Sequence, residues 1–467
     1  MLSIVQRRLQ STVATPVKRS STSLRGVLLG FFAGVSITGF GAYYYLLDEY
    51  KSSSNAVVSD VLLLQKSIRK LESHLRSDTQ YCYNHLPQGE RFSKTKNGKT
   101  VTRVPCPLDP SHTVWSDKLR RHLKSCNTLK KKLEFEASVR QLPWLVVDFN
   151  VRGEPALESS SPDYAEFAAF VRRFRDAHKQ LYSSDLEMSQ INYKYGLEER
   201  MSEVGNRKHV TQQASLIGHM AHENLLRDGT VYVEFGCGRG EFARYLLRAL
   251  DTDPALVARD KQVLLVDRQS PRMKFDTKMR EEHTSGAVTV TRFKTDIKDL
   301  DLATAVRSLA FPGKVVGFSK HLCGTATDLT LRCLLNARKD PKFQFSGFLV
   351  AMCCRHACKY NWLLEESRAY LREKFGIGQQ EFLYLSKMAC WATSGVRPGM
   401  SESDGADHFT GLNLKERTDI GLRARRAIDE SRVYAMQQHG FSAKLFNYVS
   451  PDVSIENSCM LIKNIQE

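Results

Sequence analysis

Acidic side chains are too few in this 467-residue sequence to balance the basic ones. The sequence has 51 Asp and Glu residues against 68 Lys and Arg residues, and its formal net charge is +17. This excess favours polyanionic partners, with nucleic acid ahead of an anionic membrane surface. The sequence also lacks an internal repeat. A hydrophobic fraction of 42% excludes a generally disordered chain and indicates a globular protein with a large core.

The sequence lacks an ordered cysteine framework as well. Its eleven cysteines are odd in number and are scattered through a long chain. This usage excludes a small secreted scaffold held by disulfides. It indicates a reducing compartment, in which some thiolates are available to bind a metal ion.

No acidic residue occurs before Asp48. Residues 1–25 are basic and rich in Ser and Thr, which is typical of a mitochondrial targeting segment. Residues 26–47 carry no charged side chain, and about 20 such residues are enough to cross a bilayer as a helix. We therefore predict a transmembrane helix at 26–47, and with it a membrane as a partner. A targeting presequence alone, or two neighbouring genes joined into one, explains the same composition.

The rest of the chain divides into four segments. Residues 53–77 have apolar positions at helical spacing and predict a helical spacer. Residues 82–132 are basic and contain Cys and His, as expected of a zinc-finger region. Residues 133–210 are interpreted as a linker with a helical region. From residue 211 to residue 467 strands and helices alternate, which predicts an α/β fold with a parallel sheet and crossover helices.

Four candidate zinc ligands occur close together in the sequence. Cys106, His112, His122 and Cys126 have the spacing C-x5-H-x9-H-x3-C. His122 and Cys126 are four residues apart, so one face of a helix presents both. Zinc prefers four tetrahedral sulfur and nitrogen ligands, which this segment supplies. The spacing resembles the CHHC finger of spliceosomal small-ribonucleoprotein proteins and of one family of tRNA methyltransferases.

In that methyltransferase family a CCCH finger precedes the CHHC finger. Here only its final C-x2-H part is present, as Cys82 and His85, so we do not predict a second zinc ion. Basic residues near the CHHC finger suit contacts with phosphate groups, although a solvated surface explains them as well. These residues are Lys118, Arg120, Arg121, Lys124, Lys130, Lys131 and Lys132.

A buried strand, a glycine turn and a helix start are predicted around Gly236, Gly238 and Gly240. Glycines at such a turn let the backbone pass close to a ligand. A dinucleotide-binding fingerprint requires glycine where Glu241 stands. The E-x-G-x-G-x-G pattern, which begins at Glu234, instead resembles the first motif of S-adenosylmethionine-dependent methyltransferases. This methyl donor needs acids for its ammonium group and its ribose hydroxyls.

The next two predicted strands each lead to an acid. Asp267 ends the first of them, where a carboxylate can accept hydrogen bonds from both ribose hydroxyls of the donor. Asp296 follows the second, where the methyltransferase pattern places the edge of the adenine. Glu234, Asp267 and Asp296 thus stand at successive strand ends, and together they predict one donor site.

The fourth predicted strand ends in Lys320 and His321, with Cys323 and Asp328 after them. Ligands of an open α/β sheet lie at the carboxyl ends of its strands, so these residues point to the reaction side. Methyl transfer to a ribose 2′-oxygen needs help in removing the hydroxyl proton. Lys320 or His321 is the candidate for this catalytic role. A purely structural His321 explains that position equally well.

Cys353, Cys354, His356 and Cys358 follow the fifth predicted strand. Because Cys353 and Cys354 are adjacent, all four residues could not easily bind one zinc ion, and we favour a pocket wall over a metal site. A cysteine nucleophile, as in some base methyltransferases, stays open as well.

The chain as a whole resembles the eukaryotic tRNA 2′-O-methyltransferases that modify the fourth nucleotide of the acceptor stem. The resemblance starts at residue 82 and rests on the CHHC finger and on motifs in the family's order. These are QQASLIG (212–218), VEFGCGRGEF (233–242), SKHLCGTATDLTLRCL (319–334), AMCCRHAC (351–358), KMACWATSG (387–395) and SIENSCMLI (454–462).

The resemblance implies a Rossmann-like methyltransferase domain, S-adenosylmethionine, zinc and a tRNA acceptor stem as substrate; DNA is not an expected partner. It implies the cytoplasm or the nucleus, whereas the first residues indicate a mitochondrial membrane, so the localisation stays open. The alternative is a membrane-tethered RNA-binding protein whose methyltransferase fold has lost its chemistry. The intact donor-site residues favour an enzyme.

Overall fold

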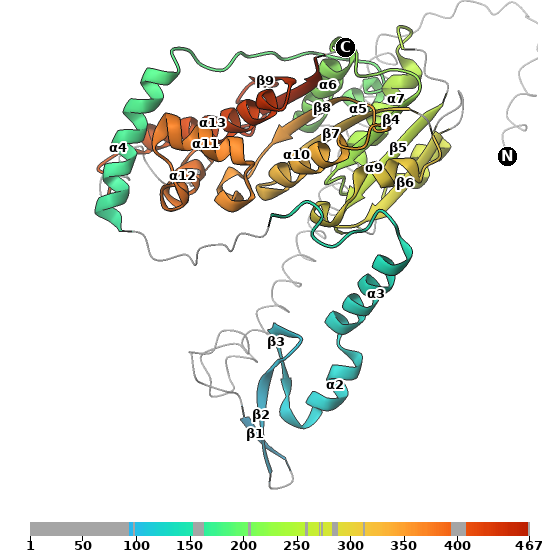
Figure 1. The fold of residues 1–467 in the computed structure, drawn as a ribbon, viewed down its shortest axis with the longest axis vertical. Helices are drawn as coiled ribbons and strands as arrows, with labels where there is room; N and C mark the ends of the chain where they lie inside the picture. The colour runs from blue at the N-terminus through green and yellow to red at the C-terminus, as the bar shows by residue number, and fades with distance from the viewer. Residues whose placement is uncertain are drawn as a thin grey trace, which may run out of the picture. The chain divides into compact units, whose positions relative to one another are not determined.

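The computed structural model describes two compact units, residues 1–132 and 133–467 (Figure 1). The described residues are 93–96, 99–152, 163–203, 207–256, 260–269, 271, 274–282, 288–311, 313–393 and 408–465. The predictions for residues 1–25, 26–47 and 53–77, and for Cys82 and His85, fall outside them. In the part of the chain that is described, no helix combines the length and the apolar character needed to cross a membrane.

The first unit contains a small antiparallel sheet followed by helices. Its strands pair in the order β1-β2-β3. The elements are β1 (Ser93–Lys96), β2 (Lys99–Cys106), β3 (Asp109–Trp115), η1 (Ser116–Lys118) and α2 (Leu119–Ser125), and α3 (Asn127–Gln141) begins in this unit. Between β2 and β3 the chain turns at Asp109, whose carboxylate accepts hydrogen bonds from the amide and the hydroxyl of Ser111.

A seven-stranded sheet lies at the centre of the second unit, in the order β6-β5-β4-β7-β8-β10-β9. Its strands are β4 (Thr230–Phe235), β5 (Lys261–Asp267), β6 (Val288–Lys294), β7 (Lys314–Leu322), β8 (Phe345–Met352), β9 (Phe441–Asn447) and β10 (Ser458–Asn464). The strand order reverses between β4 and β7. Ligands of such sheets bind outside the carboxyl ends of the strands at this switch point.

The predicted parallel sheet is present from β6 to β8, but β10 runs antiparallel to both of its neighbours. Parallel neighbours need a crossover connection, usually through a helix. Residues 448–457, which join β9 to β10, contain no helix. The chain therefore returns alongside β9 in the opposite direction, and β10 enters the sheet between β8 and β9.

Helices cover both faces of this sheet (Figure 1). Alternation along β4 sends Val231, Val233 and Phe235 to one core layer, which α9, α10 and α13 cover, and Tyr232 to the other, which α6, α7 and α8 cover. The helices are α4 (Tyr164–Leu181), α5 (Glu198–Glu203), α6 (Lys208–His222), α7 (Glu241–Thr252), α8 (Asp276–Glu281), η2 (Ile297–Asp299), α9 (Leu302–Arg307), α10 (Thr325–Ala337), η3 (Arg355–Ala357), η4 (Tyr360–Trp362), α11 (Glu365–Phe375), α12 (Gln379–Trp391) and α13 (Leu414–Gln438).

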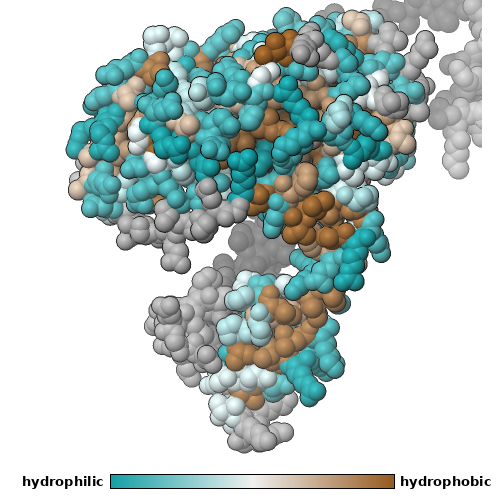
Figure 2. All heavy atoms as spheres, in the orientation of Figure 1, coloured by the Kyte–Doolittle hydropathy of each residue, from teal (hydrophilic) through white to brown (hydrophobic). Residues whose placement is uncertain are grey.

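A third apolar cluster joins α4 to α11, α12 and α13. Phe167, Phe170 and Phe174 of α4 are buried in it, each at most 3% exposed, and Phe167 stacks on Tyr384. Hydrophilic side chains predominate on the visible face of this second unit (Figure 2). Its apolar residues are thus used mainly inside the three clusters.

A buried network of charged residues ties α10 to α13 and to the segment after β8. Arg432 donates two hydrogen bonds of 2.8 Å to Asp328, and both side chains are 1% exposed. Asp429 accepts from Arg432 and from Arg355. Asp328, which we placed on the reaction side, is therefore a structural residue. Asp328 lies on the face of α10 that meets Arg432 of α13, so its side chain is used in this ion pair.

Candidate active site and zinc finger

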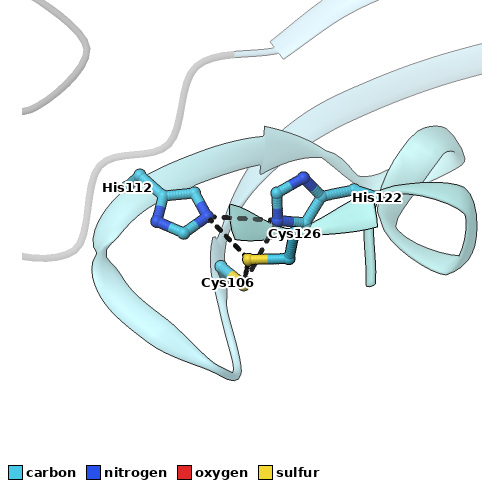
Figure 3. A group of neighbouring side chains, drawn as sticks. All are labelled: Cys106, His112, His122 and Cys126. Atoms are coloured by element: carbon cyan, nitrogen blue, oxygen red, sulfur yellow. Dashed lines mark hydrogen bonds between the residues drawn. The ribbon is translucent and has the colours of Figure 1, made fainter. Parts of the chain in front are cut away.

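The four predicted zinc ligands converge in the first unit (Figure 3). His122 Nε2 lies 3.1 Å from His112 Nε2 and 3.3 Å from Cys106 Sγ. Cys126 Sγ lies 3.8 Å from His112 Nε2 and 4.0 Å from Cys106 Sγ. A tetrahedral zinc ion with bonds of about 2.0–2.3 Å needs ligand separations of roughly 3.3–3.8 Å. The donor set and its spacing therefore fit a zinc ion.

Sheet and helix each supply two of these ligands. Cys106 ends β2 and His112 lies on β3, whereas His122 lies on α2 and Cys126 directly follows it. Sequence reasoning missed a supporting residue, Asp109, whose carboxylate lies 3.4 Å from His112 Nδ1. A carboxylate in this position orients a metal-binding imidazole. Its signal in the sequence was only that of a turn.

The predicted glycine turn connects β4 to α7. Gly236, Gly238 and Gly240 all have positive φ, at 63°, 49° and 79°. Residues other than glycine rarely adopt this backbone conformation. At Gly240 a Cβ atom would also come within 3.1 Å of Met279. These three positions therefore need glycine because of the backbone path.

Arg292, a residue that the sequence analysis did not identify, stabilises this turn through hydrogen bonds. Its guanidinium donates hydrogen bonds to Gly238 O at 2.8 Å and to Cys237 Sγ at 3.0 Å, and it pairs with Asp276 at 2.7 Å. Arg292 lies in the middle of β6, far from the glycines in sequence. No motif or spacing marks it, because its role depends on the position of β6 in the sheet.

Asp267 and Asp296 both face one cavity of about 500 Å³. The Asp267 carboxylate accepts hydrogen bonds from the amides of Gly238, at 2.8 Å, and Gln269, at 2.7 Å. Asp296 precedes η2 and accepts from the amide of Lys298. Gly236 and His321 line the same cavity. The structure thus gathers predicted residues from the ends of β4, β5, β6 and β7 around one space.

Glu234 takes a different place from the one its motif indicated. It is 4% exposed, it accepts a hydrogen bond from the amide of Ala243 in α7, and it is not among the residues that line this cavity. Burial raises the pKa of Glu234 to about 8, despite the hydrogen bond from Ala243. In this structure Glu234 supports the first turn of α7.

Lys320 and His321 occupy a bulge at the end of β7, where the pairing with β8 shifts between Lys320 and Leu322. His321 has a positive φ of 66° and lines the cavity. Non-glycine residues with positive φ are uncommon and concentrate at functional sites. The two candidates therefore differ in position, because Lys320 is not among the cavity-lining residues.

The surrounding protein shifts the pKa of both candidate catalytic side chains. Burial lowers the pKa of Lys320 to about 8. Burial, with the positive charge of Lys320 beside it, lowers the pKa of His321 to about 4. At neutral pH His321 is therefore an uncharged imidazole, whereas Lys320 is still mostly protonated.

A polar cluster around Lys320 was not predicted. Lys320 Nζ lies 3.3 Å from His209 Nδ1 on α6. Glu241, the first residue of α7, pairs with Arg200 at 2.8 Å and adds negative charge near Lys320. His209 precedes Lys320 by 111 residues, so only the packing of α6 against the sheet brings them together.

The cysteines after β7 and β8 form a different group from the predicted one. The sulfur atoms of Cys323, Cys353 and Cys354 lie within 4.8 Å of one another. Cys358 does not belong to this group, because its sulfur accepts a hydrogen bond of 3.1 Å from Arg432. His356 does not belong to it either, and its side chain is exposed. The segment does contribute to the cavity wall, through Ala357.

Two family models match the chain. Methyltransferase TRM13 matches residues 211–463, and the U11-48K-like CHHC zinc finger matches residues 103–127. The tRNA:m(4)X modification enzyme TRM13 of Debaryomyces hansenii is 35% identical over 448 residues, covering 89% of this chain and 94% of that protein. Its namesake from Saccharomyces cerevisiae is 35% identical over 465 residues, covering 85% and 94%.

Among solved structures, small RNA methyltransferase HEN1 is 13% identical, with a TM-score of 0.27, over 61% of this chain and 27% of that chain. This likeness is too low to carry an argument. The relatives and family models confirm the expected α/β methyltransferase fold with a CHHC finger. They give no support to the alternative of a membrane-tethered RNA-binding protein with an inactive fold. The chain belongs to the TRM13 family of tRNA methyltransferases, the tRNA:m(4)X modification enzymes.

Proposed function

We propose that this enzyme transfers a methyl group from S-adenosylmethionine to the ribose 2′-hydroxyl of nucleotide 4 in the tRNA acceptor stem. The observation that carries the proposal is the cavity at the switch point of the sheet. Asp267, Asp296, Gly236 of the glycine turn and His321 all line it. A methyl donor and a nucleotide can meet between these groups.

In this proposal Asp267 binds the donor ribose and Asp296 binds the adenine edge. Each Asp267 carboxylate oxygen already accepts one hydrogen bond from a backbone amide. A carboxylate oxygen offers about two lone pairs, so both oxygens can also accept a ribose hydroxyl. Gly236 lines the cavity without a side chain, which leaves room for the donor to lie against the backbone.

Lys320 or His321 would take the proton of the 2′-hydroxyl. A general base works best when its pKa lies near the pH of the reaction. Lys320, with a pKa of about 8, meets this condition better than His321, with a pKa of about 4. His321 is better placed, since it lines the cavity. The donor bound there supplies the methyl group.

The finger would contribute to tRNA binding. All of the basic residues near it are exposed, and contacts between such residues and phosphates provide affinity without sequence specificity. These are Lys118, Arg120, Arg121, Lys124, Lys130, Lys131 and Lys132.

The position of the methyl group can be tested with labelled donor and synthetic tRNA. We expect label on a tRNA with a ribose at nucleotide 4 and none on a tRNA with 2′-deoxyribose at that position alone. The matched control carries 2′-deoxyribose at nucleotide 5 and should be labelled normally. Label retained on the substrate with the deoxy nucleotide 4 would place the methyl group on a base, and a cysteine nucleophile would then become the leading mechanism.

We expect Asp267→Ala to weaken S-adenosylmethionine binding about tenfold or more, because hydrogen bonds to a charged group are worth about 1.5–3 kcal/mol. Asp267→Asn keeps one acceptor oxygen and should have an intermediate effect. Asp260→Ala, at the opposite end of β5, is the control. Calorimetry measures the affinity, and an unchanged value for Asp267→Ala would contradict the placement of the donor.

We expect kcat/KM to rise with pH up to about 8 and then level, because a base must lose its proton before it can act and the pKa of Lys320 in the free enzyme is about 8. Lys320→Met should lower kcat by roughly 10²-fold and abolish this inflection. The rate is measured from pH 6 to 9.5 on labelled tRNA. A flat profile, with a Lys320→Met variant of full activity, would assign the role of base to His321.

We expect His122→Ala to lose the zinc ion and to bind tRNA about tenfold more weakly, because the finger no longer holds its basic surface. Donor affinity should change little. Metal analysis, filter binding and calorimetry measure the three quantities, with His222→Ala, an exposed histidine of α6, as control. A variant that kept both zinc and full tRNA affinity would be evidence against this role.

A further inference from the structure

Three thiols meet where β7 and β8 end. The sulfur atoms of Cys323, Cys353 and Cys354 lie within 4.8 Å of one another, and Cys323 Sγ is 2.8 Å from Cys353 Sγ. We propose that this group is a thiol-oxidation site, at which a hydroperoxide converts Cys323 and Cys353 into a disulfide in the wall of the active-site cavity.

The backbone permits this bond. Leu322 pairs with Met352 at the end of the parallel ladder, so the next residues, Cys323 and Cys353, directly follow the ends of two adjacent strands. Adjacent strands lie about 4.8 Å apart, within the Cα separation of roughly 4.4–6.8 Å that a disulfide spans. Both cysteines follow the last paired residues, so the ladder does not hold them. The sulfur atoms need to approach by less than about 1 Å to reach bonding distance.

The two thiols differ in the way that a redox pair requires. Cys323 is exposed and lines the cavity, whereas Cys353 is buried. A hydrogen bond from Cys353, with help from Cys354 and the Arg355 guanidinium, lowers the pKa of Cys323 to about 6 despite partial burial. An accessible thiolate beside a second thiol is the usual setting of an oxidation-sensitive cysteine.

The chemistry balances with one hydroperoxide. The Cys323 thiolate attacks the peroxide O–O bond, an S–O bond forms, and the second oxygen leaves as hydroxide and takes up a proton. The Cys353 sulfur then attacks the sulfenic sulfur, the S–S bond forms, the S–O bond breaks, and water leaves with the Cys353 proton. Hydrogen bonding to the Cys323 thiolate is the main cause that raises the pKa of Cys353, and the first step removes that cause.

A metal ion is the competing explanation, and the geometry disfavours it. Two thiolates on one tetrahedral zinc ion lie about 3.8 Å apart, which is farther than the 2.8 Å between Cys323 and Cys353. Among the described residues, the group contains three ligands and no fourth. The positively charged Arg355 and Arg425 also lie near these thiols, and their charge stabilises thiolates but repels a cation.

Peptide mapping of the full-length protein after treatment with hydrogen peroxide tests the proposal. Trypsin places Cys323 on peptide 321–332, and Cys353 and Cys354 together on peptide 343–355. We expect these two peptides to be cross-linked, and thiol reductant to separate them. Because one peptide carries two cysteines, Cys353→Ser and Cys354→Ser identify the partner. The link should vanish in the first variant and persist in the second, and Cys390→Ser, a cysteine outside the group, serves as a control.

Three results would overturn the proposal. The first is a link that survives Cys353→Ser but is lost in Cys354→Ser, and the second is oxidation of Cys323 to sulfinic acid without any link. The third is a second zinc ion per chain that shields the thiols until a chelator removes it.

A further arm tests whether Cys323 faces the cavity, and it rests on the proposed donor site. Saturating S-adenosylhomocysteine should slow the formation of the link at least threefold. Calorimetry on the same sample separates the two hypotheses. If the ligand does not bind, the donor site is wrong and the oxidation site stands. If the ligand binds and the rate of linking is unchanged, the placement of the oxidation site in the cavity wall is wrong.

Discussion

A hydrogen bond from the Gly238 amide to the Asp267 carboxylate joins the ends of β4 and β5, and the shape of the proposed donor site depends on it. The turn can follow this path only because its glycines accept positive φ. Arg292 fixes the same turn from the side of β6 by donating to Gly238 O. One carboxylate thus holds the loop and, in our proposal, the donor ribose, and it has enough lone pairs for both.

Burial sets the protonation of the groups around this cavity. It raises the pKa of Glu234 to about 8 and lowers the pKa of Lys320 to about 8 and that of His321 to about 4. All three shifts favour the uncharged form, which is the effect of desolvation on an ionisable group. The finger shows the opposite arrangement, since its basic side chains are exposed to solvent. Basic side chains that could contact RNA thus lie at the surface, whereas burial favours uncharged forms at the proposed reaction centre.

Features that depend on residues close together in the sequence were predicted better than features that depend on tertiary packing. The four predicted zinc ligands converge because they lie within one hairpin, one helix and the residue that follows it. Asp267 and Asp296 reach the predicted cavity because parallel strands end at one edge of a sheet. The placement of Asp328 on the reaction side was wrong, because its carboxylate is buried in an ion pair with Arg432 of α13. Glu234 remains a donor-site prediction, but the structure places it under α7 instead of on the cavity wall.

The sequence by itself determined the family, the grouping of the four candidate zinc ligands, the glycine turn and the strand ends that carry acids, because these depend on residue type and on short spacings. Only the tertiary structure decided which side chains meet across long stretches of chain. It brought His209 to Lys320, Arg292 to Gly238 and Cys323 to Cys353. It also decided the pKa of each group, because burial depends on every element packed around a residue and has no local signature in the sequence.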